Sequence, residues 1–187
     1  MKKYKIYGRG WVKKNTYGFG NKGLGYKYTD LKSLYTQLKE KGIFRFGVEN
    51  FGRFDQPSKL TVIALALALH DAGFSYTKGQ LQDVGILGTS ISGSTETNLA
   101  YFKDYVQAGR ILGRGNFFIY TLASSPLAEA AIHFGLSGPL LFLGYSKNQK
   151  QNILKQAEFM VKTKEAKAIL VVEFSDKEAY GYFIQGK

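Results

Sequence analysis

The sequence predicts an α/β protein with a five-stranded mixed sheet, an antiparallel last strand and helices on both faces. Short apolar runs rich in β-branched residues alternate with longer stretches of helical spacing, as in α/β proteins. Hydrophobic residues make up 44% and charged residues 21% of the 187 residues, an ordinary globular composition. The last two apolar runs are joined by only Ser-Asp-Lys-Glu, which favours a hairpin. We therefore expect residues 1–187 to form a single domain.

The first 57 residues are predicted to combine one short strand with one helix. Residues 4–9 alternate weakly and predict a strand, whereas residues 10–29 are rich in Gly, Lys and Tyr and predict a loop or irregular ribbon. Asp30 is placed to cap a helix that runs to about Lys41 and stops at Gly42. Residues 1–57 are therefore predicted to be loop-rich.

A second helix, over residues 59–73, follows Pro57 and is apolar almost all round, so we expect it to be buried between layers. The remaining elements are a strand, two helices, a strand, a helix and two strands, at residues 83–88, 95–108, 126–134, 139–144, 147–163, 168–174 and 180–184. This alternation predicts a mainly parallel sheet that is covered on both faces.

The charge of the chain is concentrated near its start. The formal net charge is +12, and residues 1–59 carry fourteen Lys and Arg against four Asp and Glu. Such a field attracts an acidic partner: nucleic acid, an anionic membrane surface or an acidic protein. The start of the chain lacks the apolar run of a signal peptide, and no apolar run approaches the ~20 residues of a membrane helix. We expect a cytoplasmic protein without a membrane span.

The sequence contains no cysteine, which excludes disulfides, thiolate metal sites and thiol nucleophiles. It contains two histidines, so we expect no His-rich metal site and no cofactor. His133 is interpreted as a satisfied, buried or half-buried histidine. His70, at the end of the apolar helix, is interpreted as a structural cation or cap.

Two weaker patterns occur in the first thirty residues. Gly18-Phe-Gly-Asn-Lys-Gly23 fits G-x-G-x-x-G, but the apolar helix that a dinucleotide site needs does not follow, so a flexible loop is the better interpretation. Basic and aromatic residues interleave in a way that could stack bases and contact phosphates. They are Lys3, Tyr4, Lys5, Tyr7, Arg9, Trp11, Lys13, Lys14, Tyr17, Lys27 and Tyr28. A solvated basic edge is the favoured interpretation, and nucleic acid is the less favoured partner.

Five phrases in the central region carry a more specific pattern. They are Ala-Leu-His-Asp-Ala-Gly at the end of residues 58–73, Val-Gly-Ile-Leu-Gly-Thr-Ser-Ile-Ser-Gly at 84–93, Asn-Phe-Phe-Ile-Tyr-Thr-Leu-Ala-Ser-Ser-Pro at 116–126, Ala-Ala-Ile-His-Phe-Gly-Leu-Ser-Gly-Pro at 130–139 and Ala-Ile-Leu-Val-Val-Glu at 168–173. In order and spacing, residues 58–175 resemble the N-terminal half of β-ketoacyl synthases, while residues 1–57 match only loosely.

The resemblance implies half of a thiolase-like fold, with two departures from the family. The family's nucleophilic cysteine lies eight residues after the Gly-Pro proline, at a strand-to-helix turn, and Lys147 stands there in this chain. A lysine amine would hold an acyl group as a stable amide instead of a labile thioester. The chain also lacks the half that carries the family's two catalytic histidines. We therefore expect no catalytic residue and no enzyme.

The resemblance further implies a non-catalytic subunit of fatty-acid, polyketide or aryl-polyene-type synthesis, comparable to a chain length factor. It would pair with itself or with a full-length ketosynthase, because the buried helix 59–73 would need a partner's cover. Arg110 and Arg114 are candidates for docking an acidic acyl carrier protein. Candidates for an acyl pocket, with ordinary core as the alternative, are Ile91, Phe117, Phe118 and Ile119.

Two other classes of function stay open. A basic nucleic-acid-binding module could reuse the fold. An enzyme with new chemistry around Lys147 or His133 would transfer acyl groups to a thiol or an amine.

Overall fold

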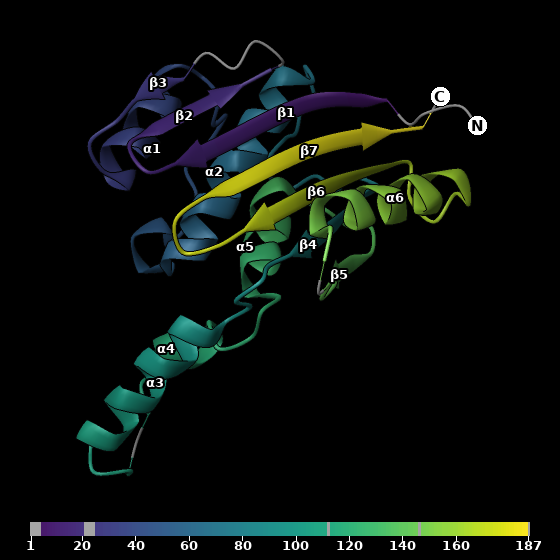
Figure 1. The fold of residues 1–187 in the computed structure, drawn as a ribbon. Helices are drawn as coiled ribbons and strands as arrows, with labels where there is room; N and C mark the ends of the chain where they lie inside the picture. Colours follow the sequence, from purple (N-terminus) through teal and green to yellow (C-terminus); the bar gives the residue numbers. More distant parts are fainter. Residues whose placement is uncertain (1–4, 21–24, 112, 146, 187) are drawn as a thin grey trace.

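The structure is a computed structural model that describes residues 5–20, 25–111, 113–145 and 147–186. Its described strands form one mixed sheet of seven strands in the order β3-β2-β1-β7-β6-β4-β5 (Figure 1). The strands are β1 (Ile6–Lys13), β2 (Thr16–Phe19), β3 (Tyr26–Lys27), β4 (Val84–Thr89), β5 (Leu140–Phe142), β6 (Ala168–Phe174) and β7 (Ala179–Gln185). The α/β class and the mixed sheet are confirmed, with seven strands in place of the five expected.

Residues 10–29 are not the predicted loop. β1 continues to Lys13 and pairs with β2 through a tight turn at Asn15, and β3 adds a short third strand. Residues 21–24, which include the second half of the glycine-rich motif, lie outside the described residues. The glycines of β1 explain the error. A Cβ at Gly8 would lie 2.0 Å from the carbonyl oxygen of Ala68, and one at Gly10 would lie 2.3 Å from that of Ala64. Glycine is required here because a helix packs directly on the strand.

That helix is α2 (Gln56–Asp71), which starts at the N-cap Asp55 with Pro57 in its first turn. Its side chains from Pro57 to Leu69 are buried, apart from the half-buried Lys59, as the apolar pattern predicted. The cover, however, comes from the chain itself: α2 packs on β1, β6 and β7 and against α1 (Leu31–Glu40) and α5 (Ser125–Phe134). The expectation that this helix needs a partner is therefore wrong.

The pairing of the strands is less parallel than predicted. β4 is parallel to β5 and β6, but β6–β7, β7–β1, β1–β2 and β2–β3 are antiparallel. The short turns at Asn15 and at residues 175–178 join neighbouring strands directly, which only antiparallel pairs allow. The predicted final hairpin, β6–β7, is confirmed.

The two faces of the sheet differ in their cover. α2 and α5 lie behind the sheet in Figure 1, and α6 (Gln149–Lys162) lies in front of it, against β4, β6 and β7. No described helix covers the front of β1 and β2. The register places Arg9, Trp11 and Lys13 on this open face, because Gly8, Gly10 and Val12 point to α2.

After β4 the chain leaves the body as a projecting arm (Figure 1). We define the arm as residues 91–123; it contains α3 (Thr95–Gln107) and α4 (Gly115–Ile119). No side chain of α3 is buried. The predicted helix 95–108 is confirmed, and the short helix α4 follows it between the two helices that the sequence predicts. Within the described residues, no helix is long and apolar enough to cross a membrane.

Candidate functional site

An open cleft of about 800 Å³ lies where the arm meets the body, and we call it the arm cleft. The body contributes residues around the start of α2 and the β6–β7 turn, and the arm contributes residues from α3 and α4. Its lining residues are Arg53, Phe54, Asp55, Gln56, Pro57, Glu96, Thr97, Ala100, Arg114, Asn116, Phe117, Tyr120, Asp176 and Lys177. Part of the lining is an apolar wall, formed by Phe54, Pro57, Ala100 and Phe117.

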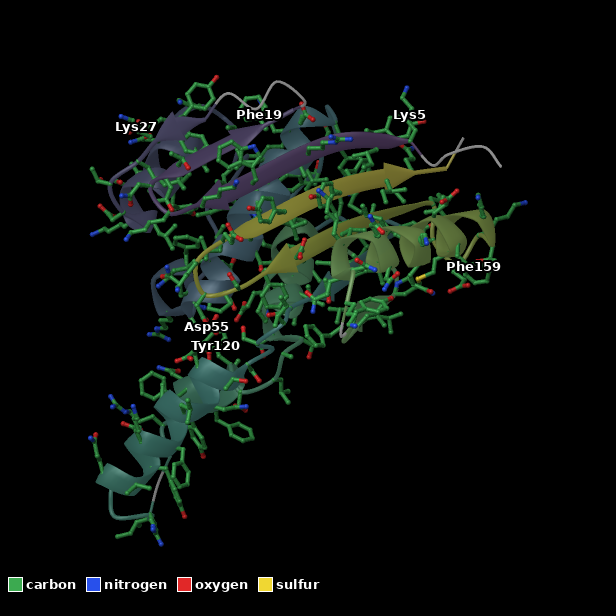
Figure 2. The ribbon with its side chains drawn as sticks, in the orientation of Figure 1. Lys5, Phe19, Lys27, Asp55, Tyr120 and Phe159 are labelled. Carbon is green, nitrogen blue, oxygen red and sulfur yellow. The ribbon has the colours of Figure 1, made fainter. Side chains whose placement is uncertain are left out.

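Two hydrogen bonds join the arm to the body beside this cleft. The hydroxyl of Thr97 on α3 donates to Oδ2 of Asp55 at 3.2 Å, and the hydroxyl of Tyr120 donates to Oε1 of Glu129 on α5 at 3.0 Å. Asp55 and Tyr120 are labelled at this junction in Figure 2. The ring of Tyr120 also packs on Phe54, with centroids 6.4 Å apart. These contacts set the position of the arm relative to α2.

Carboxylates gather at this junction, and the pKa values of two of them, Glu129 and Asp176, are raised. Burial raises the pKa of Glu129, and the charge of Asp55 raises it further, although the bond from Tyr120 opposes this. Burial also raises the pKa of Asp176, with added contributions from Glu96 and Asp55. The pKa of the Tyr120 hydroxyl is raised by burial and by Glu129, so the phenol stays protonated and remains a donor. No cluster of three or more His, Asp or Glu in the described residues has a geometry that could hold a metal ion.

Arg114 lies on the arm side of the cleft. It forms an ion pair with Asp104 of α3, and this pair lowers the pKa of the Asp104 carboxyl. Its guanidinium carbon also lies 4.9 Å from the centroid of the Phe117 ring, a cation–π distance. The arm cleft therefore has an apolar wall next to the Arg114 guanidinium, whose positive charge is already largely compensated by Asp104.

The other residues singled out from the sequence do not gather in the arm cleft. Phe118 and Ile119 are exposed on the arm, and Ile91 is 90% exposed, so the ordinary-core alternative is wrong for these three. Arg110 is exposed, with a positive φ of 61°, in the turn after α3. Lys147 is exposed in the turn between β5 and α6, and its carbonyl oxygen accepts a bond from the side chain of Asn152 at 3.1 Å.

The two histidines also lie outside the arm cleft. His133 is buried among Phe46, Phe134 and neighbouring rings, and it lines a separate cavity of about 250 Å³. Its Nε2 has no hydrogen-bond partner among the described residues, so it is buried as expected but not satisfied. His70 is exposed in the last turn of α2, 5.2 Å edge-on from the ring of Phe19.

Sequence reasoning missed most of the cleft. Asp55 carries a usable signal, because Asp-Gln-Pro-Ser is a helix start. Tyr120 and Lys177 carry none, since their positions depend on how the arm folds back onto the body.

Comparison with known proteins identifies the fold. No family model and no curated protein sequence matches the chain. Among solved structures, it is similar to the ishigamide ketosynthase/chain length factor, with a TM-score of 0.64 and 13% identity over 97% of this chain and 61% of that one. The chain has half of a thiolase-like fold. It spans about three fifths of the length of that ketosynthase-type chain.

Two further structures place the same fold in complexes. A ketosynthase with its chain length factor from Xenorhabdus doucetiae matches with a TM-score of 0.61 and 14% identity, over 100% of this chain and 80% of that one. The AntDE:AntF structure, a type II polyketide synthase acyl-carrier protein in complex with its ketosynthase, contains a chain that matches with a TM-score of 0.63 and 10% identity. The match covers 97% of this chain and 57% of that one. At these identities the likeness shows the thiolase-like fold alone.

Proposed function

We propose that this chain is a non-catalytic, ketosynthase-like subunit that pairs with a second ketosynthase-like chain in fatty-acid, polyketide or aryl-polyene-type synthesis. The observation that carries the proposal is a ketosynthase-type fold in a sequence without cysteine. A chain without a thiol cannot form the thioester by which the family holds its acyl group. Lys147 stands where the resemblance places the nucleophile, and its amine would form an amide that is too stable to react onward.

Pairing is supported by apolar surface on the arm. Phe102, Phe118 and Leu122 are 59%, 60% and 63% exposed, and Ile111 is 82% exposed. Exposed apolar side chains concentrated on one projecting element mark an interaction surface. β5, at one edge of the sheet, also leaves one side without a described partner strand, and Leu141 on it is 40% exposed. Two of the similar structures are named for a ketosynthase together with a chain length factor.

Binding of an acyl carrier protein is the second part of the proposal. The net charge of +12 favours an acidic partner, and a carrier protein accompanies the ketosynthase in one similar structure. Because Asp104 already compensates Arg114, Arg110 is the stronger docking candidate of the two. Phe117 in the arm cleft is the best-placed residue to contact an acyl chain.

The pairing is tested by measuring the mass in solution, alone and after co-expression with a ketosynthase from the same organism. The wild-type chain should form a complex of two chains, and Phe102→Ser/Phe118→Ser should release monomers. Phe159→Ser is the matched control, because Phe159 on α6 is 57% exposed but lies away from the arm (Figure 2). A monomeric wild type under both conditions would contradict the proposal.

The non-catalytic role is tested separately by intact-mass measurement after incubation with acyl-coenzyme A and with acylated carrier protein. We expect no acyl adduct and no condensation product. Carbon–carbon bond formation by the isolated chain would refute the proposal even if the chain pairs.

The nucleic-acid alternative is favoured by one specific observation, the open face of β1. Nζ of Lys13 lies 5.6 Å from the Trp11 ring and 5.3 Å from the Tyr180 ring, and Arg9 flanks them on the same face. Cations beside aromatic rings are the chemistry that binds single strands. Trp11 is the sole tryptophan, so quenching of its fluorescence by a single-stranded oligonucleotide, lost at high salt, is the direct test. Absence of quenching at low salt would eliminate this alternative.

A further inference from the structure

A second and larger cleft, of about 1160 Å³, lies on the other side of the α2 start, and we call it the lysine cleft. Four lysines line it, each from a different segment: Lys14 from the β1–β2 turn, Lys32 from α1, Lys59 from α2 and Lys177 from the β6–β7 turn. They are far apart in sequence and are brought together only by the fold. Their convergence places four positive charges around one concave surface.

The charges of these lysines are poorly compensated by the protein. None of the four forms an ion pair with a described residue. Two carboxylates, Asp30 and Asp176, line the same cleft. Oδ1 of Asp30 is engaged in capping α1, where it accepts the backbone N–H groups of Lys32 and Ser33 at 2.9 Å each. Burial, and then the neighbouring carboxylates Glu96 and Asp55, disfavour the negative charge of Asp176. A cleft lined in this way concentrates anions.

The rest of the lining suits a planar group better than a bare ion. The ring of Phe51 stacks on Tyr35, with centroids 4.2 Å apart and planes inclined by 20°, and Tyr28, Leu31 and Val48 extend this apolar wall. Asn15 and Asn50 also line the cleft, and neither side-chain amide has a hydrogen-bond partner among the described residues. They could therefore donate to an anion's oxygens. The volume is ample, since pockets for small ligands measure roughly 300–1000 Å³.

We propose that the lysine cleft binds a small organic phosphate: two or more phosphate groups held by the four lysines, attached to a planar ring that lies on the aromatic wall. This inference goes beyond the proposed subunit function and does not depend on it. The lysine cleft shares Gln56, Asp176 and Lys177 with the arm cleft, so a bound phosphate would lie next to the candidate acyl site.

The test is calorimetric titration of the full chain with ADP, with inorganic pyrophosphate and with adenosine, at about 50 mM and about 300 mM NaCl. We expect ADP to bind more tightly than pyrophosphate, adenosine to give no measurable heat, and affinity to fall at the higher salt. Lys32→Ala/Lys59→Ala should raise the Kd for ADP about a hundredfold, at about tenfold for each charge-assisted contact. Lys103→Ala/Lys155→Ala, an equal charge change away from this cleft, should leave the Kd within about twofold.

Because Lys59 is half-buried, Lys14→Ala/Lys177→Ala in two exposed turns serves as a second variant whose folding is not at risk. Equal weakening in the cleft and control variants would show a general charge effect and overturn the proposal. Absence of binding by both ADP and pyrophosphate would do the same. A third outcome would also overturn the proposal: binding of a single-stranded oligonucleotide that requires the four lysines and that ADP does not displace. The cleft would then be a contact for nucleic acid.

Discussion

The Asp55 carboxylate joins the start of α2 to the arm: its Oδ1 accepts the backbone N–H of Ser58 at 3.0 Å, and its Oδ2 accepts the hydroxyl of Thr97 at 3.2 Å. One side chain therefore caps the central helix and holds the arm. Asp55→Ala should lower the free energy of unfolding by ~1–2 kcal/mol, because the cap and the tie are both lost. Thr97→Val should cost less than ~1 kcal/mol. Urea unfolding measures both.

Asp55→Asn is the control for this pair of bonds, because asparagine caps helices as well as aspartate does. Its unfolding free energy should lie close to that of the wild type. If Thr97→Val were as destabilising as Asp55→Ala, the helix cap would contribute nothing and the dual role would be wrong.

Gly10 permits the close packing of β1 on α2. Gly10→Ala should destabilise the protein by about 3 kcal/mol or more, because its Cβ would meet backbone atoms of α2 that cannot move aside. Gly52→Ala is the matched control, since a Cβ there has no atom within 4 Å and the residue is exposed. Comparable melting temperatures for the two variants would show that the strand–helix contact is not tight.

The contact between Gly10 and α2 also explains why the sequence does not predict the N-terminal strands correctly. α1, α2, α5, α6 and the final hairpin were predicted within a few residues, because capping residues and apolar periodicity are local signals. The strand predicted over residues 4–9 ends too early, and β2 is predicted as loop. Gly10 reads locally as a loop residue, but it is required by a helix about fifty residues away. Likewise, the all-round apolar pattern of α2 predicted burial correctly but could not identify what covers it.

The candidate sites were less predictable for a related reason. Phe117 was identified and does line the arm cleft, but it shares a sequence phrase with Phe118 and Ile119, which point to solvent. A five-residue helix decides which side chain faces inward, and no local pattern fixes its rotation. No sequence pattern predicts the lysine cleft apart from the basic charge of the first third of the chain, because its four lysines come together only when the chain folds.

His133 should make the stability depend on pH. Burial lowers its pKa to about 4, against an ordinary value near 6.5, and only the charge of Glu49 acts in the opposite direction. Between these values the unfolded chain binds a proton that the folded chain does not. Stability should therefore fall as the pH drops from about 6.5 to about 4, by on the order of 2–3 kcal/mol. Urea unfolding across this range gives the slope.

His133→Phe should remove this slope, because phenylalanine fits among the surrounding rings and binds no proton. It should also stabilise the protein slightly by removing the unpartnered Nε2. His70→Gln, at the exposed end of α2, should keep the wild-type loss. A His133→Phe variant with an unchanged slope would assign the pH dependence to other groups.

Phe117 and Phe118 provide a direct comparison of the two sides of α4. Phe117 lines the arm cleft, whereas Phe118 is 60% exposed on the arm surface. If the cleft holds an acyl chain, Phe117→Asp should weaken binding of a fluorescent fatty acid by about tenfold or more, because a charge would enter the apolar wall. Phe118→Asp should change binding less than about twofold while disturbing pairing. Equal affinities in the two variants would place the fatty acid elsewhere and remove Phe117 from the site.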